Sequence, residues 1–122
     1  MPDPEMTVIN KPDAVIANGA SLSSVVCKKH YRKILIFMPD AWTAADITFA
    51  VCDTPDGTFN KLTYGVDGNE VTIKAVASAV IALDGKALNA LEACPYFKIR
   101  SGTSGTPVNQ LAERTLRIVK IR

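Results

Sequence analysis

Short turn motifs recur along the chain and divide it into segments of about the length of a β-strand. They are Asn18-Gly19, Pro39-Asp40, Pro55-Asp56-Gly57, Asp67-Gly68-Asn69, Asp84-Gly85 and Ser101-Gly102. Glycine and asparagine tolerate the positive φ that tight turns require, and proline presets the φ of a turn's first corner. Turns at such short intervals are typical of a β-sandwich or barrel rather than of a helical fold. We therefore expect an all-β protein.

Hydrophobic and polar residues alternate inside these segments. In residues 46–52, DITFAVC, the side chains of Ile47, Phe49 and Val51 fall on one face of an extended chain. The same period of two recurs in three further segments, 69–74, 96–100 and 114–121. Such alternation predicts strands with one buried face.

Other segments indicate how the strands connect. Residues 46–52 and 58–64 flank a short loop, which predicts an antiparallel hairpin, and the turn after 64 predicts a third strand in a meander. The apolar run 33–38, KILIFM, favours a central strand covered on both faces, with a short buried helix as the alternative. Residues 87–93 contain helix formers and are followed by Cys94-Pro95, which predicts one short helix.

These segments add up to about eight or nine strands and one short helix. We expect a single antiparallel β-sandwich of jelly-roll type. The length of 122 residues has room for one domain, which we assign to residues 13–122. Residues 1–12, which contain Pro2, Pro4 and Pro12, predict an extended N-terminal arm, with a frayed terminus as the alternative.

The chain lacks the residue groups that enzymes use for nucleophilic or metal chemistry. His30 is the one histidine and lies among cationic residues, without a carboxylate nearby in sequence to orient it. Cys27, Cys52 and Cys94 are odd in number and form no CxxC pair, which indicates free thiols rather than zinc ligands. We expect no enzymatic activity, no cofactor and no metal site.

Four acidic residues, Asp53, Asp56, Asp67 and Glu70, lie in or beside the predicted turns. Paired carboxylates perform acid–base chemistry, and a carboxylate cluster can bind calcium, which takes roughly six to eight oxygen ligands. The spacing does not match an EF-hand loop. Aspartate is also favoured in turns, because its side chain bonds the backbone two residues on. We interpret these acids as turn-forming residues.

A basic strip, Lys28, Lys29, Tyr31, Arg32 and Lys33, is the one local cluster of charge. It is a candidate protein-contact site, because cations attract an acidic partner surface. The alternative is a sheet edge that lysines protect from pairing with other strands. Nucleic acid is a weaker interpretation, since the net charge is only +2 and the strip carries no recognition motif. We expect no nucleic-acid partner.

Residues 101–107, SGTSGTP, predict a flexible, polar surface loop without the lysine and long helix of a phosphate-binding loop. Loops of β-sandwiches often carry contacts, because the scaffold below them is rigid. The candidate protein-contact residues here are Thr103, Ser104, Val108 and Asn109. Four aromatic residues, Tyr31, Trp42, Tyr64 and Tyr96, are candidates for a sugar-stacking platform, with core packing as the alternative.

Residues 1–15 hold acids and prolines where a signal peptide has a basic start and an apolar run. The apolar runs elsewhere are far shorter than the roughly 20 residues that a membrane-spanning helix needs. We expect a soluble protein made in the cytoplasm, with no membrane partner.

Four segments follow one another in a distinctive order: WTAADITFAV (42–51), DGTF (56–59), DGNEV (67–71) and YFKIRSGTSGTPVNQ (96–110). This order resembles a group of small proteins encoded in the structural-gene regions of tailed bacteriophages and prophages. The resemblance runs from about Pro39 to Arg122 and is a pattern of strands and turns, to which no active-site motif belongs. The chain is also similar, more distantly, to discoidin and galactose-binding jelly rolls. The first 38 residues lie outside the resemblance.

The phage resemblance implies a virion component, a head decoration or capsid-stabilising protein that binds the shell through its arm and loops. Its partner would be the major capsid protein or another virion protein. It would form a homo-oligomer, with a trimer favoured, and would join the virion after assembly in the host bacterial cytoplasm. The alternative function is a carbohydrate- or host-surface-binding β-sandwich module, associated with the tail or with adsorption.

Overall fold

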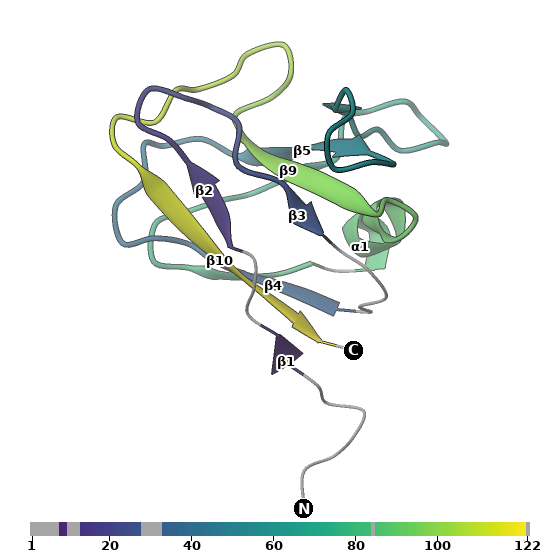
Figure 1. Cartoon of the computed structure of the whole chain (residues 1–122), viewed down its shortest axis with the longest axis horizontal. Coiled ribbons are helices and arrows are strands. Elements are labelled where there is room, and N and C mark those ends of the chain that lie inside the picture. Colours follow the sequence, from purple (N-terminus) through teal and green to yellow (C-terminus); the bar gives the residue numbers. More distant parts are fainter. Residues whose placement is uncertain (1–7, 10–12, 28–32, 84, 122) are drawn as a thin grey trace, which may run out of the picture.

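The structure is a computed structural model that describes residues 8–9, 13–27, 33–83 and 85–121. Within these ranges the chain forms ten strands and one helix (Figure 1). The strands are β1 (Val8–Ile9), β2 (Ala14–Ile16), β3 (Val26–Cys27), β4 (Lys33–Phe37), β5 (Ile47–Cys52), β6 (Asn60–Lys61), β7 (Thr72–Ile73), β8 (Val80–Ala82), β9 (Tyr96–Ser101) and β10 (Arg114–Ile121). The helix is α1 (Gly85–Glu92).

The strands form two antiparallel sheets. In the first sheet, β10 lies between β4 and an edge that β1 and β2 share, and β8 lies outside β4. In the second sheet, β5 lies between β9 and an edge that β6 and β7 share, and β3 lies outside β9. The chain changes sheet after β2, β3, β4, β7, β8 and β9. This is the strand order of a jelly roll, so the predicted antiparallel sandwich with one short helix is confirmed.

The core lies between the two sheets, on the faces that the alternation predicted. Its fully buried side chains include Ile34, Ile36, Leu116 and Ile118 from the first sheet and Ile47, Phe49, Phe97 and Ile99 from the second. The rings of Phe49 and Phe97 meet edge to face, with centroids 5.8 Å apart. Aromatic quadrupoles favour this geometry, which joins the two central strands of the second sheet from the inside.

The outer faces of β4 and β5 differ from the prediction. The run 33–38 predicted a strand covered on both faces, but Leu35 and Phe37 on the outer face of β4 are only half-buried. The period of two predicted that Thr48 of β5 faces solvent, but its side chain is fully buried. Thr48 Oγ1 donates to Gly102 O at 2.8 Å, so the end of β9 and the loop after it cover this part of β5.

The two strands at the outer edge of β5 are shorter than predicted. The predicted hairpin of residues 46–52 and 58–64 is confirmed, since β6 pairs with the second half of β5. The predicted three-strand meander is confirmed in part. Residues 62–64 and 69–71 pair antiparallel, with Thr63 opposite Glu70 and Val71 N–H donating to Leu62 O at 3.0 Å, whereas β7 itself pairs with the first half of β5. β6 is only two residues long and pairs with the second half of β5. The edge of the first half of β5 is therefore available to β7.

Helix α1 confirms the predicted short helix, with a start two residues earlier in the chain. Ala87 and Leu91 are its buried side chains and pack into the core. Cys94 N–H donates to Leu91 O at 2.9 Å, and Pro95 follows directly, which ends the helix. No helix in the described part of the chain is long and apolar enough to cross a membrane.

Part of the predicted arm, residues 1–12, belongs to the first sheet. Val8 and Ile9 form β1, which pairs antiparallel with the last residues of β10. The other arm residues lie outside the described residues. The division into an arm and a domain of residues 13–122 stays a prediction.

Candidate contact surface

The loop between β9 and β10, residues 101–110, is called the contact loop here, because several predicted contact residues lie in it (Figure 1). Its backbone turns at Gly102, beyond which Val108 N–H donates to Ser101 O at 2.8 Å. Thr103 and Thr106 exchange two backbone hydrogen bonds of 3.2 Å. The loop lies at the surface as predicted, and its backbone closes as a hydrogen-bonded hairpin.

The predicted contact residues of this loop are unequally accessible. Ser104 and Asn109 are exposed, and Thr103 and Val108 are half-buried. Leu111, directly after the loop, is 77% exposed. Leu111 was not predicted as a contact residue, because a single leucine in a polar turn is a weak signal. An exposed leucine beside a rigid polar loop is the arrangement of an apolar anchor with a polar rim.

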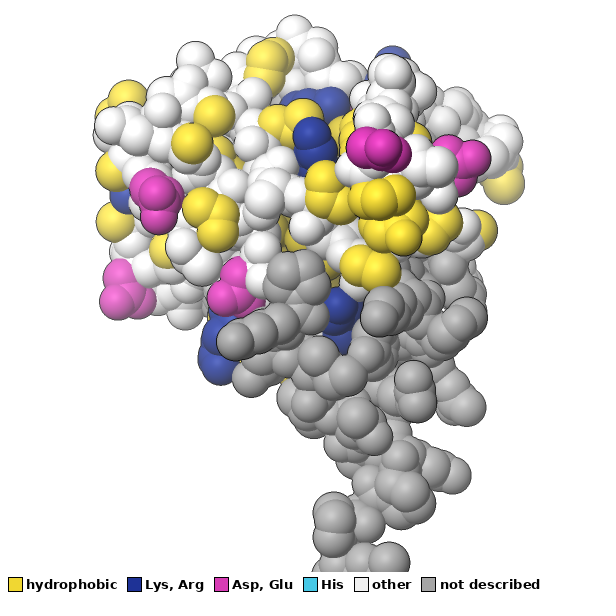
Figure 2. All heavy atoms as spheres, in the orientation of Figure 1, with side chains coloured by type: hydrophobic (Ala, Val, Ile, Leu, Met, Phe, Trp, Pro, Cys, Tyr) yellow, Lys and Arg dark blue, Asp and Glu magenta, His cyan; other side chains and the backbone are white. Residues whose placement is uncertain are grey.

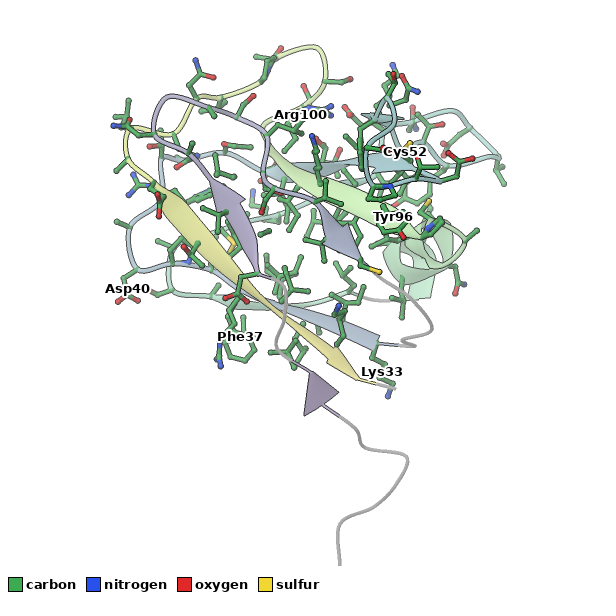
Figure 3. All side chains as sticks on the ribbon, in the orientation of Figure 1. Lys33, Phe37, Asp40, Cys52, Tyr96 and Arg100 are labelled. Carbon is green, nitrogen blue, oxygen red and sulfur yellow. The ribbon has the colours of Figure 1, made fainter. Side chains whose placement is uncertain are left out.

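Glu70 fastens the contact loop to the second sheet. Its carboxylate accepts the Ser104 N–H at 3.1 Å and the Ser104 hydroxyl at 3.2 Å. The same carboxylate forms an ion pair with Arg100 of β9 at 3.2 Å. The Arg100 side chain is 13% exposed and the Glu70 side chain is 15% exposed. Arg100 also donates to Thr48 Oγ1 at 3.3 Å. Figure 3 shows Arg100 at the end of the molecule where the contact loop lies. These bonds fix the position of Ser104 relative to the second sheet.

Replacement of Glu70 by alanine is expected to lower the free energy of unfolding by about 1–2 kcal/mol, because hydrogen bonds to a charged group are worth about that much. Urea denaturation measures this change, and hydrogen exchange of the Ser104 amide should become faster. Glu113→Ala is the matched control, since Glu113 is exposed and a change there should stay within about 0.5 kcal/mol. Equal effects of the two substitutions would contradict the role assigned to Glu70.

Gln110 anchors the other end of the contact loop and is fully buried. Its amide nitrogen donates to Ser101 Oγ at 2.7 Å and to Thr43 O at 3.0 Å. Its amide oxygen accepts Thr43 N–H at 2.9 Å and Arg114 Nε–H at 3.1 Å. Gln110 therefore ties the loop to the start of β10 and to the segment that precedes β5.

The structure describes little of the basic strip. Lys28, Lys29, Tyr31 and Arg32 lie outside the described residues. Lys33 is exposed at the start of β4. Figure 3 shows Lys33 and Arg100 at opposite ends of the molecule, so Lys33 does not join the contact loop in one patch. The basic strip stays a predicted contact site, separate from the loop.

The described aromatic residues of the predicted sugar platform are half-buried and separate. Trp42 donates its indole N–H to Ala45 O at 3.0 Å. The ring of Tyr64 is covered by Lys86 Nζ, 4.3 Å from its centroid. Tyr96 begins β9, at the end of this strand away from the contact loop. Tyr31 lies outside the described residues. No ring contact joins these three described side chains, so the glycan-binding alternative gains no support from stacking among them.

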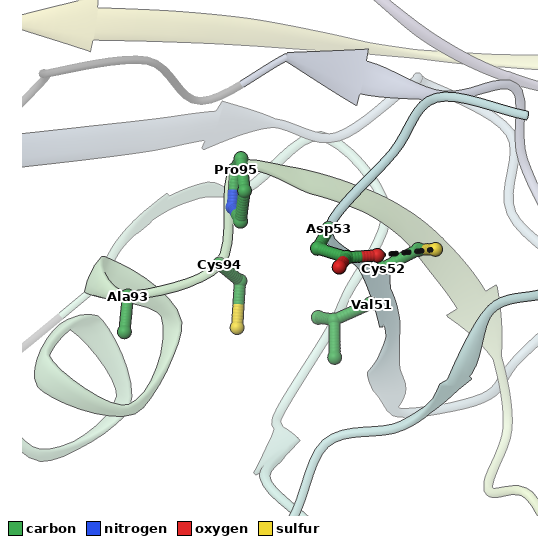
Figure 4. A pocket seen from close by; sticks show the side chains of 6 residues that line it. All are labelled: Val51, Cys52, Asp53, Ala93, Cys94 and Pro95. Carbon is green, nitrogen blue, oxygen red and sulfur yellow. Dashed lines mark hydrogen bonds between the residues drawn. The ribbon is translucent and has the colours of Figure 1, made fainter. Parts of the chain in front are cut away.

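The three cysteines form no disulfide within the described part of the chain, and all three are half-buried. Two of them line a shallow pocket of about 210 Å³ between the end of β5 and the end of α1. Its lining residues are Val51, Cys52, Asp53, Ala93, Cys94 and Pro95. In Figure 4 the Cys94 thiol projects into this space beside Val51, while the Cys52 thiol points away and lies 3.6 Å from Asp53 Oδ1. The surface of this pocket is mostly apolar, and the Cys94 thiol donates to Ala90 O at 3.8 Å.

Of the four acids interpreted as turn-forming, Asp67 has that role, but the interpretation is wrong for Glu70, whose carboxylate binds Arg100 and Ser104 across the fold. Asp67 Oδ1 accepts Asn69 N–H at 2.9 Å, the bond that the turn interpretation predicts. Asp53 and Asp56 are exposed. Among the described residues, no three His, Cys, Asp or Glu side chains come together in a way that could hold a metal ion. His30 lies outside the described residues, and the absence of enzymatic activity stays a prediction.

Acidic side chains are dispersed over the visible face of the molecule. Figure 2 shows the acids in separate places, and hydrophobic side chains that gather on the right of this face and are scattered elsewhere. Within the described part of the chain, the most exposed large hydrophobic residues are Val66, Val76, Val80 and Leu111. Leu111 is the member of this set that adjoins the contact loop.

Comparison with protein-family models finds no match, and comparison with curated proteins finds none either. Among solved structures, the fold is similar to that of the SPBc2 prophage-derived protein YomS, with a TM-score of 0.58. The two sequences are 14% identical, and the superposition covers 100% of this chain and 97% of that chain. At this identity the likeness shows a shared fold.

Proposed function

We propose that the chain is a non-enzymatic structural component of a tailed phage particle, a head decoration or capsid-stabilising protein. Its partner is the major capsid protein or another virion protein, and it joins the virion in the host bacterial cytoplasm. The full-length similarity in fold to a prophage-derived protein supports a phage origin. The observation that carries the proposal is the contact loop, a hydrogen-bonded surface hairpin with the exposed Leu111 directly after it.

A rigid loop suits a contact role because binding then costs little conformational entropy. Glu70 holds Ser104 in place, and Gln110 holds the far end of the loop. Thr103, Val108 and Asn109 supply further polar and apolar surface around the exposed Leu111. Interfaces commonly place an apolar anchor inside such a polar rim. The basic strip and the N-terminal arm are proposed as additional contacts with the shell.

Co-sedimentation with empty heads of the phage that encodes the chain tests this proposal. We expect saturable binding of the wild-type protein. Leu111→Asp should weaken binding about tenfold or more, because loss of an interface anchor typically costs more than about 1 kcal/mol. Val66→Asp is the matched control, since Val66 is fully exposed in a different turn, and it should bind as the wild type does.

Two results would overturn the proposal. One is failure of the folded wild-type protein to sediment with heads that carry all their other proteins. The other is equal binding by Leu111→Asp and wild-type protein, which would remove the contact loop from the interface.

A further inference from the structure

Strand β8 forms one edge of the first sheet and presents an exposed apolar surface there. Among the described strands, β8 pairs with β4 alone, in the register Leu35↔Ala82 and Phe37↔Val80. Val80 is 54% exposed, and Ala82 is also exposed. Phe37, opposite Val80, points away from the space between the sheets in Figure 3. The exposed apolar surface of this edge is therefore that of Val80 and Ala82, since the Arg117 guanidinium covers the Phe37 ring, 4.1 Å from its centroid.

The backbone of β8 has unused hydrogen-bonding groups. Just outside its two ends, Met38 N–H donates to Ala79 O at 2.9 Å and Leu83 N–H donates to Ile34 O at 3.1 Å. Bonded and non-bonded pairs alternate in an antiparallel ladder, so the middle residue of β8 is also bonded to β4. The first and last residues of β8 are Val80 and Ala82. Their backbone N–H and C=O groups point away from β4. No described residue outside β8 hydrogen-bonds to these groups.

This edge also lacks the usual protection against pairing. Edge strands in soluble proteins commonly carry a lysine, a proline or a bulge that discourages another strand. Residues 75–83, AVASAVIAL, contain no charged residue and no proline. An unprotected apolar edge with free backbone donors and acceptors is a surface that another strand can extend.

We infer that β8 pairs with β8 of a second copy of this chain, antiparallel and about a two-fold axis at Ile81. In this register, Val80 of each copy lies opposite Ala82 of the other, and the two Ile81 residues lie opposite each other. The free groups of both copies then form four hydrogen bonds, two for each Val80–Ala82 pair. The first sheets of the two copies become one continuous sheet.

The second copy fits this edge because the edge complements itself. Its free donors and acceptors lie symmetrically about Ile81, as an isologous interface requires. Two uncharged strands also meet without repulsion, whereas an edge shaped for a charged partner would carry the opposite charge. The inference is independent of the proposed shell binding. It gives a dimer or a larger even-numbered assembly, which differs from the predicted trimer.

Light scattering behind a size-exclusion column, at concentrations up to about 1 mM, measures the association over the range of weak complexes. We expect a dimer that dissociates on dilution. Hydrogen exchange should show the amides of Val80 and Ala82 protected in the dimer and unprotected in the monomer. The Ile81 amide should be protected in both states, because it is bonded to β4.

Val80→Pro removes two of the four intermolecular donors and leaves the ladder with β4 intact. It should shift the midpoint of association to at least tenfold higher concentration, with an unchanged circular dichroism spectrum. Val80→Lys should act in the same direction and serves if the proline variant does not fold. Val66→Lys adds the same charge at an exposed valine away from β8 and should associate normally.

Three outcomes would overturn the inference. They are a monomer at every concentration, a trimer, and a dimer in which the Val80 and Ala82 amides exchange freely. A dimer that both Val80 variants form as readily as the wild type would also overturn it. Binding of capsid protein to β8 in place of a second copy would appear as the monomer outcome.

Discussion

Gly102→Ala is expected to lower the free energy of unfolding by about 3 kcal/mol. Gly102 has a φ of +87°, a conformation that costs an L-residue about 1–2 kcal/mol. An added Cβ would also lie 2.5 Å from Thr106 O and 2.8 Å from Val108 N. Both atoms belong to the backbone of the contact loop, so relief requires the loop to open, and such overpacking typically costs about 1–3 kcal/mol.

Urea denaturation measures this loss, and Gly105→Ala is the matched control. Gly105 lies in the same loop, and an added Cβ there would meet nothing within 4 Å. Its replacement should change the free energy of unfolding by less than about 0.5 kcal/mol. If the two variants were equally stable, the contact loop would not be held closed at Gly102.

Gln110→Leu is expected to cost about 3 kcal/mol as well. The leucine has a similar volume but removes four hydrogen bonds, to Ser101, Thr43 and Arg114. Polar groups left buried without a partner cost about 1–3 kcal/mol each, and part of this cost is recovered where water reaches the site. Proteolysis within residues 101–110 should also become faster, because the loop loses its anchor.

Two further variants define the origin of this effect. Gln110→Glu keeps the two hydrogen bonds that the side chain accepts, from Thr43 N–H and Arg114, and loses the two that it donates. If the accepted bonds dominate, this variant should be more stable than Gln110→Leu. Asn109→Leu is the control for an added leucine in the loop, since Asn109 is exposed. A Gln110→Leu protein as stable as Asn109→Leu would show that the buried amide contributes little.

The long strands could be predicted from the sequence, because alternation is a local property. β9 keeps a burial period of two over all six residues, and β5 and β10 each carry the sequence alternation that predicted them, although Thr48 and Ala50 of β5 and Val119 and Lys120 of β10 are buried as well. The placement of β6 and β7 could not be predicted in this way. Each is two residues long, so the choice of partner depends on the path of the intervening turn and not on a pattern inside the strand.

The candidate site was predictable only in outline. Turn residues and polarity placed Ser104 in a surface loop, which the structure confirms. The two residues that position the loop act over long separations in sequence. Glu70 reaches Ser104 across 34 residues, and Gln110 reaches Thr43 across 67 residues. Glu70 was interpreted as a turn acid and Gln110 was not singled out, because no local pattern marks a side chain whose partners come from another part of the chain.

The pairing of the first strands with the last has a consequence for how the chain reaches its fold. Ala14 of β2 lies opposite Leu116 of β10, roughly 100 residues later in the chain. β10 is also the strand that joins β4 to the rest of the first sheet. Contacts of such high sequence separation slow folding, because a long loop must close before they form. During synthesis, the first sheet therefore stays incomplete until the last strand has left the ribosome.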